Sequence, residues 1–421
     1  FSISSLKKLR HNLSCNSLPK YSNIIQMILL LASLVSCQNF AFLYAGSADF
    51  YNYRHQADIF TIYTQLLKRG FSKEQILLCA FDDIASSPSN PFQGQIFHSL
   101  DHKINVYPGK ESINHRGAEV NAKLYTDTVA NFPTTSEDNI FMYYDNHGGP
   151  NLLGSPTGDL ISAHNLLFAF QDAEPKKLYK KVFFVIEACY SGSVAMVLSN
   201  LTNVGIITAA NNLESSYAAV YDSEVGTYLT NEFTNYFCSL IDEKPDISIG
   251  EFFSIIEKEM EQSHACIFGD ESIRSMPISD FLGKPKNIRK FALTHNKDKS
   301  TFLLAKPKDA THKTLDHFAK HPKACIRAKA RLESLRIKAL SEKLDAVLEL
   351  LVNYVDPANF DVIMNDTESD ATPDYYSIVK VFSEKFGEIN PDDYGRFNVL
   401  KALAARHSKA KILQGIFAVV F

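Results

Sequence analysis

Two stretches of the sequence place reactive side chains just after apolar runs. One reads KVFFVIEACYSGS (181–193) and the other NIFMYYDNHGG (139–149), so Cys189 and His147 each follow an apolar run by a few residues. Only a thiolate is a strong nucleophile, and a neighbouring imidazole lowers the pKa of the thiol. These residue types predict a cysteine nucleophile, Cys189, with His147 as its acid and base.

Gly148 adds to this pattern because glycine lets the backbone approach a substrate closely. Its amide and that of Cys189 could both donate to a developing oxyanion. The competing interpretation is that Cys189 is a small buried hydrophobe, which is the commoner role of such a residue.

The apolar runs before Cys189 and His147 suit strands that are buried on both faces of a parallel sheet. Chemistry in such sheets gathers at the carboxyl ends of the strands. The alternation of further strands and helices predicts parallel pairs with right-handed crossovers, and hence an α/β fold. The other strands are expected at 40–45, 75–81 and 204–210, and the helices at 52–69, 121–132, 163–173, 226–240 and 249–262.

The composition changes after Lys284, where Lys and Arg outnumber the acids. We expect an α/β domain at 40–283, a basic linker at 284–311 and a smaller all-α domain at 312–421. Helices are predicted at 315–355, 375–385 and 391–406. The apolar end of the chain, 412–421, is about half as long as a membrane anchor needs to be.

The first 39 residues are interpreted as a non-mature segment, with a signal peptide at about 27–37 that reads MILLLASLVSC and Met27 as a candidate start. The alternative is a buried first helix. A signal peptide would send the protein into the secretory pathway, to be secreted or to enter a lysosome-like or vacuole-like compartment.

Composition excludes several classes of protein. The formal net charge of −4 argues against a general nucleic-acid binder. The seven cysteines show no metal-ligand spacing, and no glycine-rich phosphate loop is present. We therefore expect no metal, no cofactor, no nucleic-acid partner and no membrane anchor.

Residues 40–283 resemble the legumain family of asparaginyl endopeptidases, which are caspase-like cysteine proteases. The resemblance rests on five stretches in order, which are YNYRHQAD (51–58), FDDIA (81–85), HGG (147–149), IEACYSGS (186–193) and TAANNLESSYAAVYD (208–222). It implies a caspase-like, mostly parallel sheet flanked by helices, with Cys189 as nucleophile and His147 as acid and base. Asn52 matches the third catalytic residue, which would orient the histidine.

The resemblance also implies a pocket for an asparagine side chain. The matching positions are Arg54, His55, Glu187, Ser215, Ser216 and Asn231. A carboxamide needs donors for its oxygen and an acceptor for its NH₂. Arg54 and His55 can donate and Glu187 can accept, so peptides with asparagine at P1 are the expected substrates.

Three positions depart from the family pattern. The family has an acid where this chain has Asn231, which suggests the hypothesis that aspartate at P1 is tolerated as well. The residue before the catalytic histidine is usually Asp and is Asn146 here. GSADF (46–50) replaces GSNGW, with no evident consequence from the sequence.

The C-terminal region falls where legumains carry a helical prodomain that covers the active site. We expect it to act as an intramolecular inhibitor, with its basic stretch against Glu187, Asp222 and Glu224. Acid would release it as carboxylates lose charge, and the alternative is a permanently docked helical domain. Candidate cleavage points are Asn287, Asn296 and Asp298.

Three other functions compete with an acid-activated asparaginyl protease. The catalytic subunit of glycosylphosphatidylinositol transamidase shares the YRH and HGG elements, although its nucleophile stretch usually departs from EACxSGS. A peptide ligase would pass the thioester to an amine rather than to water. A scaffold without activity is disfavoured, because Asn52, His147 and Cys189 are all present.

Overall fold

The computed structural model describes residues 38–285 and 303–420. The expected signal peptide at 27–37 and the three candidate cleavage points lie outside the described residues. Residues 39–421 form one compact unit.

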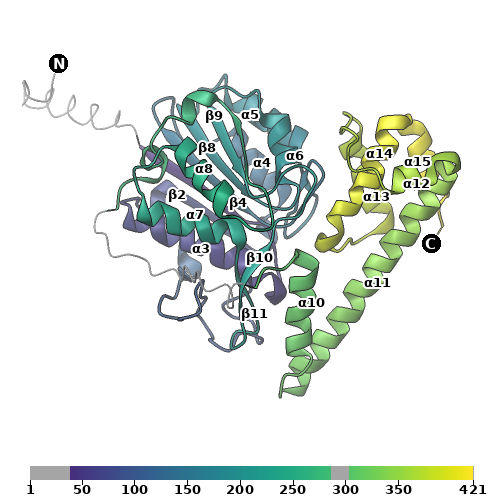
Figure 1. The fold of residues 1–421 in the computed structure, drawn as a ribbon, viewed down its shortest axis with the longest axis horizontal. Coiled ribbons are helices and arrows are strands. Elements are labelled where there is room, and N and C mark those ends of the chain that lie inside the picture. The colour runs from purple at the N-terminus through teal and green to yellow at the C-terminus, as the bar shows by residue number, and fades with distance from the viewer. Residues whose placement is uncertain (1–37, 286–302, 421) are drawn as a thin grey trace, which may run out of the picture. The chain divides into compact units, whose positions relative to one another are not determined.

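A seven-stranded sheet organises the first part of this unit (Figure 1). Its strand order is β12-β9-β8-β4-β1-β2-β3, and all neighbouring strands are parallel except β12 and β9. The bounds are β1 (Asn39–Ala45), β2 (Ile76–Ala80), β3 (His115–Arg116), β4 (Asn139–Asp145), β8 (Lys181–Glu187), β9 (Val204–Thr208) and β12 (Cys266–Gly269). The predicted mostly parallel sheet is confirmed.

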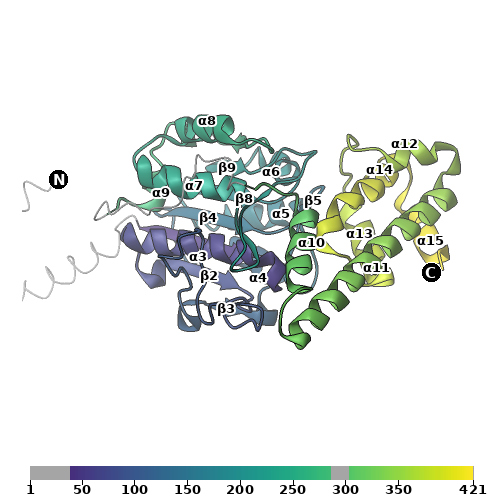
Figure 2. The same ribbon diagram turned by 60° about the horizontal axis from the view of Figure 1, so that its bottom comes forward.

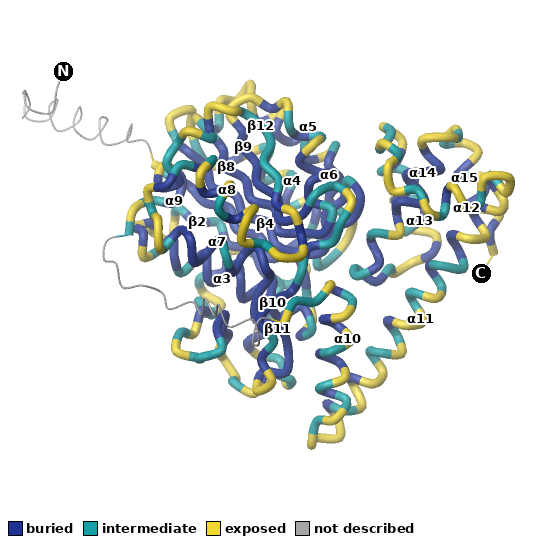
Figure 3. The backbone as a smooth tube through the Cα atoms, in the orientation of Figure 1, coloured by how far each residue is buried: buried dark blue, intermediate teal, exposed yellow. Residues whose placement is uncertain are grey.

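Helices cover both faces of the sheet, which explains why the central strands are apolar throughout. Successive side chains of a strand point to opposite faces. Phe141 and Tyr143 accordingly pack with α3 (Tyr53–Lys68) and α7 (Glu232–Glu243), whereas Ile140 and Met142 pack with the helices of the other face. The helices of the other face are α4 (Ala122–Ala130), α5 (Ala163–Ala173) and α6 (Ser191–Leu198). Figures 2 and 3 show the helical layers and the buried strands between them.

The helix expected at 226–240 was wrong in its first turn. Residues Thr227–Asn231 form strand β11, which pairs antiparallel with β10 (Ala218–Asp222), and α7 begins at Glu232. Gly226 makes the turn with a φ of 82°. The β-branched Thr227 and Thr230 favour a strand. Asn231 is therefore the last residue of β11 and directly precedes α7.

The C-terminal part is helical, as predicted, and we call residues 307–418 the helical segment. It comprises α10 (Pro307–Phe318), α11 (Ala324–Val355), α12 (Phe360–Met364), α13 (Tyr375–Phe386), α14 (Asn398–Arg406) and α15 (Lys409–Ala418). The expected helix at 315–355 is divided at 319–323, where Pro322 cannot continue a helix. The expected helix at 391–406 begins as a 3-10 helix, η7 (Pro391–Phe397).

The helical segment and the residues just before it contact the sheet part of the unit directly. The Tyr375 hydroxyl donates to the Pro150 carbonyl at 3.0 Å, and the backbones of Ala305 and Ala218 exchange two hydrogen bonds. Leu152 joins the apolar core of the helices. Within the described residues, no helix has the length and apolar character to cross a membrane.

Candidate active site

Strands β4 and β8 bring His147 and Cys189 to the same edge of the sheet. Asp145 and Glu187 are register partners at the two strand ends, and the Asn146 amide donates to the Glu187 carbonyl at 3.0 Å. A Cβ at Gly148 would collide with the carbonyl oxygen of Cys189. The position therefore requires glycine, and the predicted juxtaposition of the two motifs is observed.

Both ring nitrogens of His147 face a side chain. Nε2 lies 2.8 Å from Oδ1 of Asn52, and Nδ1 lies 3.4 Å from Oδ1 of Asp392. Asn52 lies in a short 3-10 helix, η1 (Phe50–Asn52), whereas Asp392 comes from η7 of the helical segment. Burial and the charge of Arg54 lower the pKa of His147 well below its ordinary value. The imidazole is therefore neutral in this form.

Cys189 is buried beneath the same edge. Its Sγ lies 3.9 Å from both the carbonyl oxygen and Oγ of Ser216. Tyr190, in the left-handed region at a φ of 56°, turns the chain from β8 into α6. Burial raises the pKa of the Cys189 thiol and outweighs the opposing contributions of Ser215, Ser216 and Arg54. The sulfur is thus held as a thiol here.

Arg54 and Asn231 form a buried pair. Nε of Arg54 donates to Oδ1 of Asn231 at 2.9 Å, and Nη1 donates to the Tyr51 carbonyl at 3.3 Å. Nδ2 of Asn231 in turn donates to Asp58 and Asp145. Neither acid was singled out from the sequence. Asp58 lies within the predicted helix at 52–69, and Asp145 ends the apolar run before His147. Neither position by itself indicates a contact with Asn231.

Glu187 and His55 complete the predicted pocket. The Thr234 hydroxyl donates to Oε2 of Glu187 at 3.3 Å, while the buried Oε1 has no hydrogen-bond partner. Burial and the Asp58 charge raise the pKa of Glu187 to about 8. His55 pairs through Nδ1 with the Ser47 hydroxyl at 2.7 Å, and its ring meets that of His147 edge to face.

The 3-10 helix η7 covers this site. A Cβ at Gly149 would lie 2.7 Å from the Tyr394 carbonyl oxygen, and one at Gly395 would lie 2.5 Å from the Tyr190 hydroxyl. The side chain of Asp392 is 2% exposed. Sequence reasoning missed this residue because an acid in the first turn after Pro391 is the usual complement to a helix dipole.

Most of the basic stretch lies outside the described residues, and two of the acids expected to face it, Asp222 and Glu224, lie beside His102. Nε2 of His102 pairs with Asp222 at 2.5 Å, and Nδ1 of the same ring lies 3.8 Å from Glu224. Lys313 instead places its ammonium 3.9 Å from the centre of the Tyr221 ring. Contact between the helical segment and this face is thus made partly through cation–π packing.

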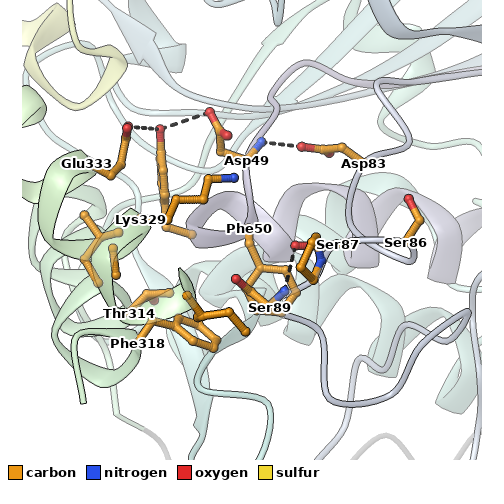
Figure 4. A pocket seen from close by; sticks show the side chains of 15 residues that line it. Asp49, Phe50, Asp83, Ser86, Ser87, Ser89, Thr314, Phe318, Lys329 and Glu333 are labelled. Carbon is orange, nitrogen blue, oxygen red and sulfur yellow. Dashed lines mark hydrogen bonds between the residues drawn. The ribbon is translucent and has the colours of Figure 1, made fainter. Parts of the chain in front are cut away.

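The replaced GSNGW motif has a structural consequence at Asp49. This residue has a φ of 72°, where glycine is the usual occupant. The Tyr51 hydroxyl lies 3.2 Å from Asp49 and 3.3 Å from Glu333 of α11 (Figure 4). Burial and the Glu333 charge raise the pKa of Asp49. These residues line a cavity of about 250 Å³ between η1 and helices α10 and α11.

The described residues contain no cluster of His, Cys, Asp and Glu that could hold a metal ion. The site consists of side chains and main-chain amides.

Several curated proteins resemble this chain in sequence. The vacuolar-processing enzyme delta-isozyme of Arabidopsis thaliana is 32% identical over 61% of this chain and 60% of its own length. Mus musculus legumain is 31% identical over 57% and 58%. The GPI-anchor transamidase of Saccharomyces cerevisiae is 28% identical over 59% and 65%. The chain therefore spans about three-fifths of the length of these curated relatives.

A solved caspase-1 from Spodoptera frugiperda is 12% identical and aligns with 55% of this chain and 88% of its own, at a TM-score of 0.34. The model of the Peptidase C13 family matches residues 39–284, which include Asn52, His147 and Cys189. The chain belongs to the Peptidase C13 family of cysteine peptidases and resembles its legumain members.

Proposed function

We propose that the protein is an endopeptidase that cleaves peptide bonds after asparagine, with Cys189 as nucleophile and His147 as acid and base. The observation that carries this proposal is the 2.8 Å contact between Asn52 and His147 at the strand edge that also holds Cys189. Because Asn52 occupies Nε2, it fixes the ring with Nδ1 as the working nitrogen. Nδ1 is then the atom that exchanges protons with the sulfur.

The chemical steps follow from these positions. Nδ1 takes the thiol proton, and the thiolate attacks the carbonyl carbon of the scissile bond. The amides of Gly148 and Cys189 donate to the resulting oxyanion. The imidazolium then protonates the leaving amine, the C–N bond breaks, and a thioester remains on Cys189. Water attacks the thioester as His147 takes its proton, which releases the acid product and the thiol.

The pocket formed by Arg54 and Glu187 suits the P1 carboxamide. Nε and Nη1 of Arg54 are engaged by Asn231 and Tyr51, and we assign Nη2 to the substrate oxygen. Oε1 of Glu187 is buried without a partner and can accept from the substrate NH₂, whether or not the carboxyl is protonated. His55, Ser215 and Ser216 complete the walls.

The docked helical segment makes this form latent. Asp392 lies against Nδ1 of His147, the nitrogen that the mechanism requires, and the Cys189 thiol is buried. Cleavage in the basic linker followed by departure of the segment would open both. We assign the protein to a secretory or vacuole-like compartment, an assignment supported by its likeness to a vacuolar-processing enzyme.

Acid release draws on His317 as well as on carboxylates such as Asp159, which pairs with Lys380 across the docking surface at 2.6 Å. Burial, His321 and Lys320 lower the pKa of His317, whose Nδ1 lies 3.4 Å from the Tyr221 hydroxyl. Docking that lowers a histidine pKa weakens as the pH falls below the ordinary value of about 6.5. The pH dependence that Asp392 contributes has the opposite sign. Burial raises its pKa in the docked form, so its contribution to docking weakens as the pH rises through that raised pKa.

The experiment is cleavage of a fluorogenic Ala-Ala-Asn peptide after incubation of the full chain between about pH 4 and about pH 7. Turnover that is lost in Cys189→Ala is the expected result. A matched Ala-Ala-Gln peptide should stay intact, because the longer side chain overfills the pocket. Cleavage of both peptides, or of neither, would refute asparaginyl specificity.

Transamidation is the second candidate function, and the yeast transamidase relative favours it. The same thioester on Cys189 would then be taken by an amine instead of by water. Cleavage in the presence of hydroxylamine or a glycine-led peptide distinguishes the two outcomes. A hydroxamate would report the thioester that both reactions share, whereas a ligated product in place of the free acid would assign the transfer reaction.

A further inference from the structure

Asn231 lies at the centre of a buried polar cluster. Its Nδ2 donates to Oδ2 of Asp58 and to Oδ1 of Asp145, both at 3.0 Å, and its main-chain amide also donates to Asp58. Its Oδ1 accepts from Nε of Arg54 at 2.9 Å. A flipped amide would turn its NH₂ toward the guanidinium and its oxygen toward two carboxyls. The two acids therefore fix the orientation of the amide.

Asp145 lies directly beneath the proposed specificity pocket. It is the last residue of β4, it is fully buried, and its register partner across the sheet is Glu187. Register partners in a parallel sheet project to the same face. The legumain resemblance expects an acid at position 231, and here an amide at that position is held by acids from β4 and α3.

We infer that Asp145 is a positioning residue for P1 recognition, which with Asp58 holds the Asn231 amide so that Arg54 can present Nη2 to a substrate carboxamide. This inference rests on the proposed function, because it assigns a role in that same pocket. The acid that position 231 lacks is supplied by Asp145 at the end of β4 and by Asp58 of α3.

Asn and Val are informative replacements for Asp145. Burial and the charges of Asp58 and Glu187 raise the pKa of Asp145 well above its ordinary value, although Arg54 opposes them. A neutral carboxylic acid still accepts one hydrogen bond from Asn231. Asparagine reproduces that acceptor and that charge, whereas valine has a similar shape and no acceptor.

The first experiment measures KM and kcat of the activated enzyme on the Ala-Ala-Asn peptide. Asp145→Val should raise KM about tenfold with a smaller change in kcat, because a fixed hydrogen bond in the pocket is lost. Asp145→Asn should stay within about threefold of the parent enzyme. Equal losses in both variants, a loss confined to kcat, or no loss in either would overturn the inference.

A second measurement needs no substrate and covers the case in which Asp145→Val does not fold. Asn231→Asp alone brings a third carboxyl against Asp58 and Asp145 and should lower Tm. Adding Asp145→Asn lets the new amide donate to the new carboxyl, so the double variant should recover at least half of the loss. Additive losses would contradict the coupling.

These outcomes separate the two proposals. Absence of any Cys189-dependent cleavage would refute the protease and, with it, the role in recognition, while the unfolding cycle would still decide whether Asp145 holds Asn231. Cleavage that is equal in the parent enzyme, Asp145→Val and Asp145→Asn would refute only the positioning role.

Discussion

Two buried acids near Arg54 are accommodated in different ways. Asp145, on the sheet, accepts a hydrogen bond from Asn231 at 3.0 Å. Asp392, on the helical segment, places Oδ1 3.4 Å from Nδ1 of His147. Each acid leaves one buried oxygen without a hydrogen-bond partner, Oδ2 of Asp145 and Oδ1 of Asp392, which is costly in both places. The two acids differ in what carries them: Asp145 is the last residue of a central strand, whereas Asp392 belongs to the helical segment that we propose departs on activation.

The largest expected effect concerns Asn52, which belongs to the sheet part of the active site. Asn52→Ala frees Nε2 of His147, and loss of ring orientation should lower kcat of the activated enzyme about a hundredfold. Asn52→Asp retains an acceptor at the same distance and is the matched control, with a smaller loss expected. Steady-state kinetics on the Ala-Ala-Asn peptide measures both. Similar rates for the parent enzyme and Asn52→Ala would remove Asn52 from the catalytic machinery.

The next effect tests whether the helical segment covers the active site, and the reactivity of Cys189 measures it. Burial raises the pKa of this thiol, so in the intact chain the thiolate appears only at alkaline pH. Cleavage in the linker and removal of residues 303–420 should speed alkylation by iodoacetamide at about pH 7 by about tenfold or more. Peptide mass spectrometry follows the reaction, and the exposed Cys325 is the internal reference in the intact chain. Equal rates before and after cleavage would contradict a covering role.

A smaller effect concerns the pH at which the helical segment dissociates. Burial, part of it against Gly226 of the sheet part, lowers the pKa of His317, so protonation on acidification should favour release. His317→Gln removes that protonation, and its release should need a pH lower by about half a unit. The exposed His312→Gln is the matched control. Size-exclusion chromatography of the cleaved protein across about pH 4 to about pH 7 gives the midpoint, and coincident midpoints for the three proteins would exclude His317 as the sensor.

The smallest effect concerns the strained turn at Asp49, where the sheet part meets the helical segment. Glycine adopts a φ of 72° without a steric penalty, so Asp49→Gly should stabilise the intact chain by about 1 kcal/mol. The same change removes the acid that faces Glu333. Thermal unfolding measures the gain, and Asp49→Asn is the control that removes the charge but keeps a side chain. A lower Tm for Asp49→Gly would show that the side-chain contacts outweigh the backbone strain.

The elements that carry the site were predictable because their signals are local. Strands β4 and β8 coincide with the apolar runs before His147 and Cys189, since each run is followed at once by polar residues. The first turn of the expected helix at 226–240 failed because pairing with β10 decides that segment. Periodicity could not reveal this pairing, because β10 itself was not predicted.

The missed residues depend on contacts between distant parts of the chain. Asp392 lies far from His147 in sequence, and only docking of the helical segment brings the two together. Asp145 acquires its role from Asn231, which lies on a different strand. A single sequence shows the residue types but not which buried acid each amide will meet.

The central claim is most directly tested by labelling with a peptide whose C-terminal asparagine carries an electrophilic Michael acceptor. The account predicts a single adduct on Cys189 after linker cleavage, little labelling of the intact chain, and little labelling by the matched glutamine peptide. Equal labelling of the intact and cleaved chains, or an adduct on another residue, would contradict a covered asparaginyl site built on Cys189.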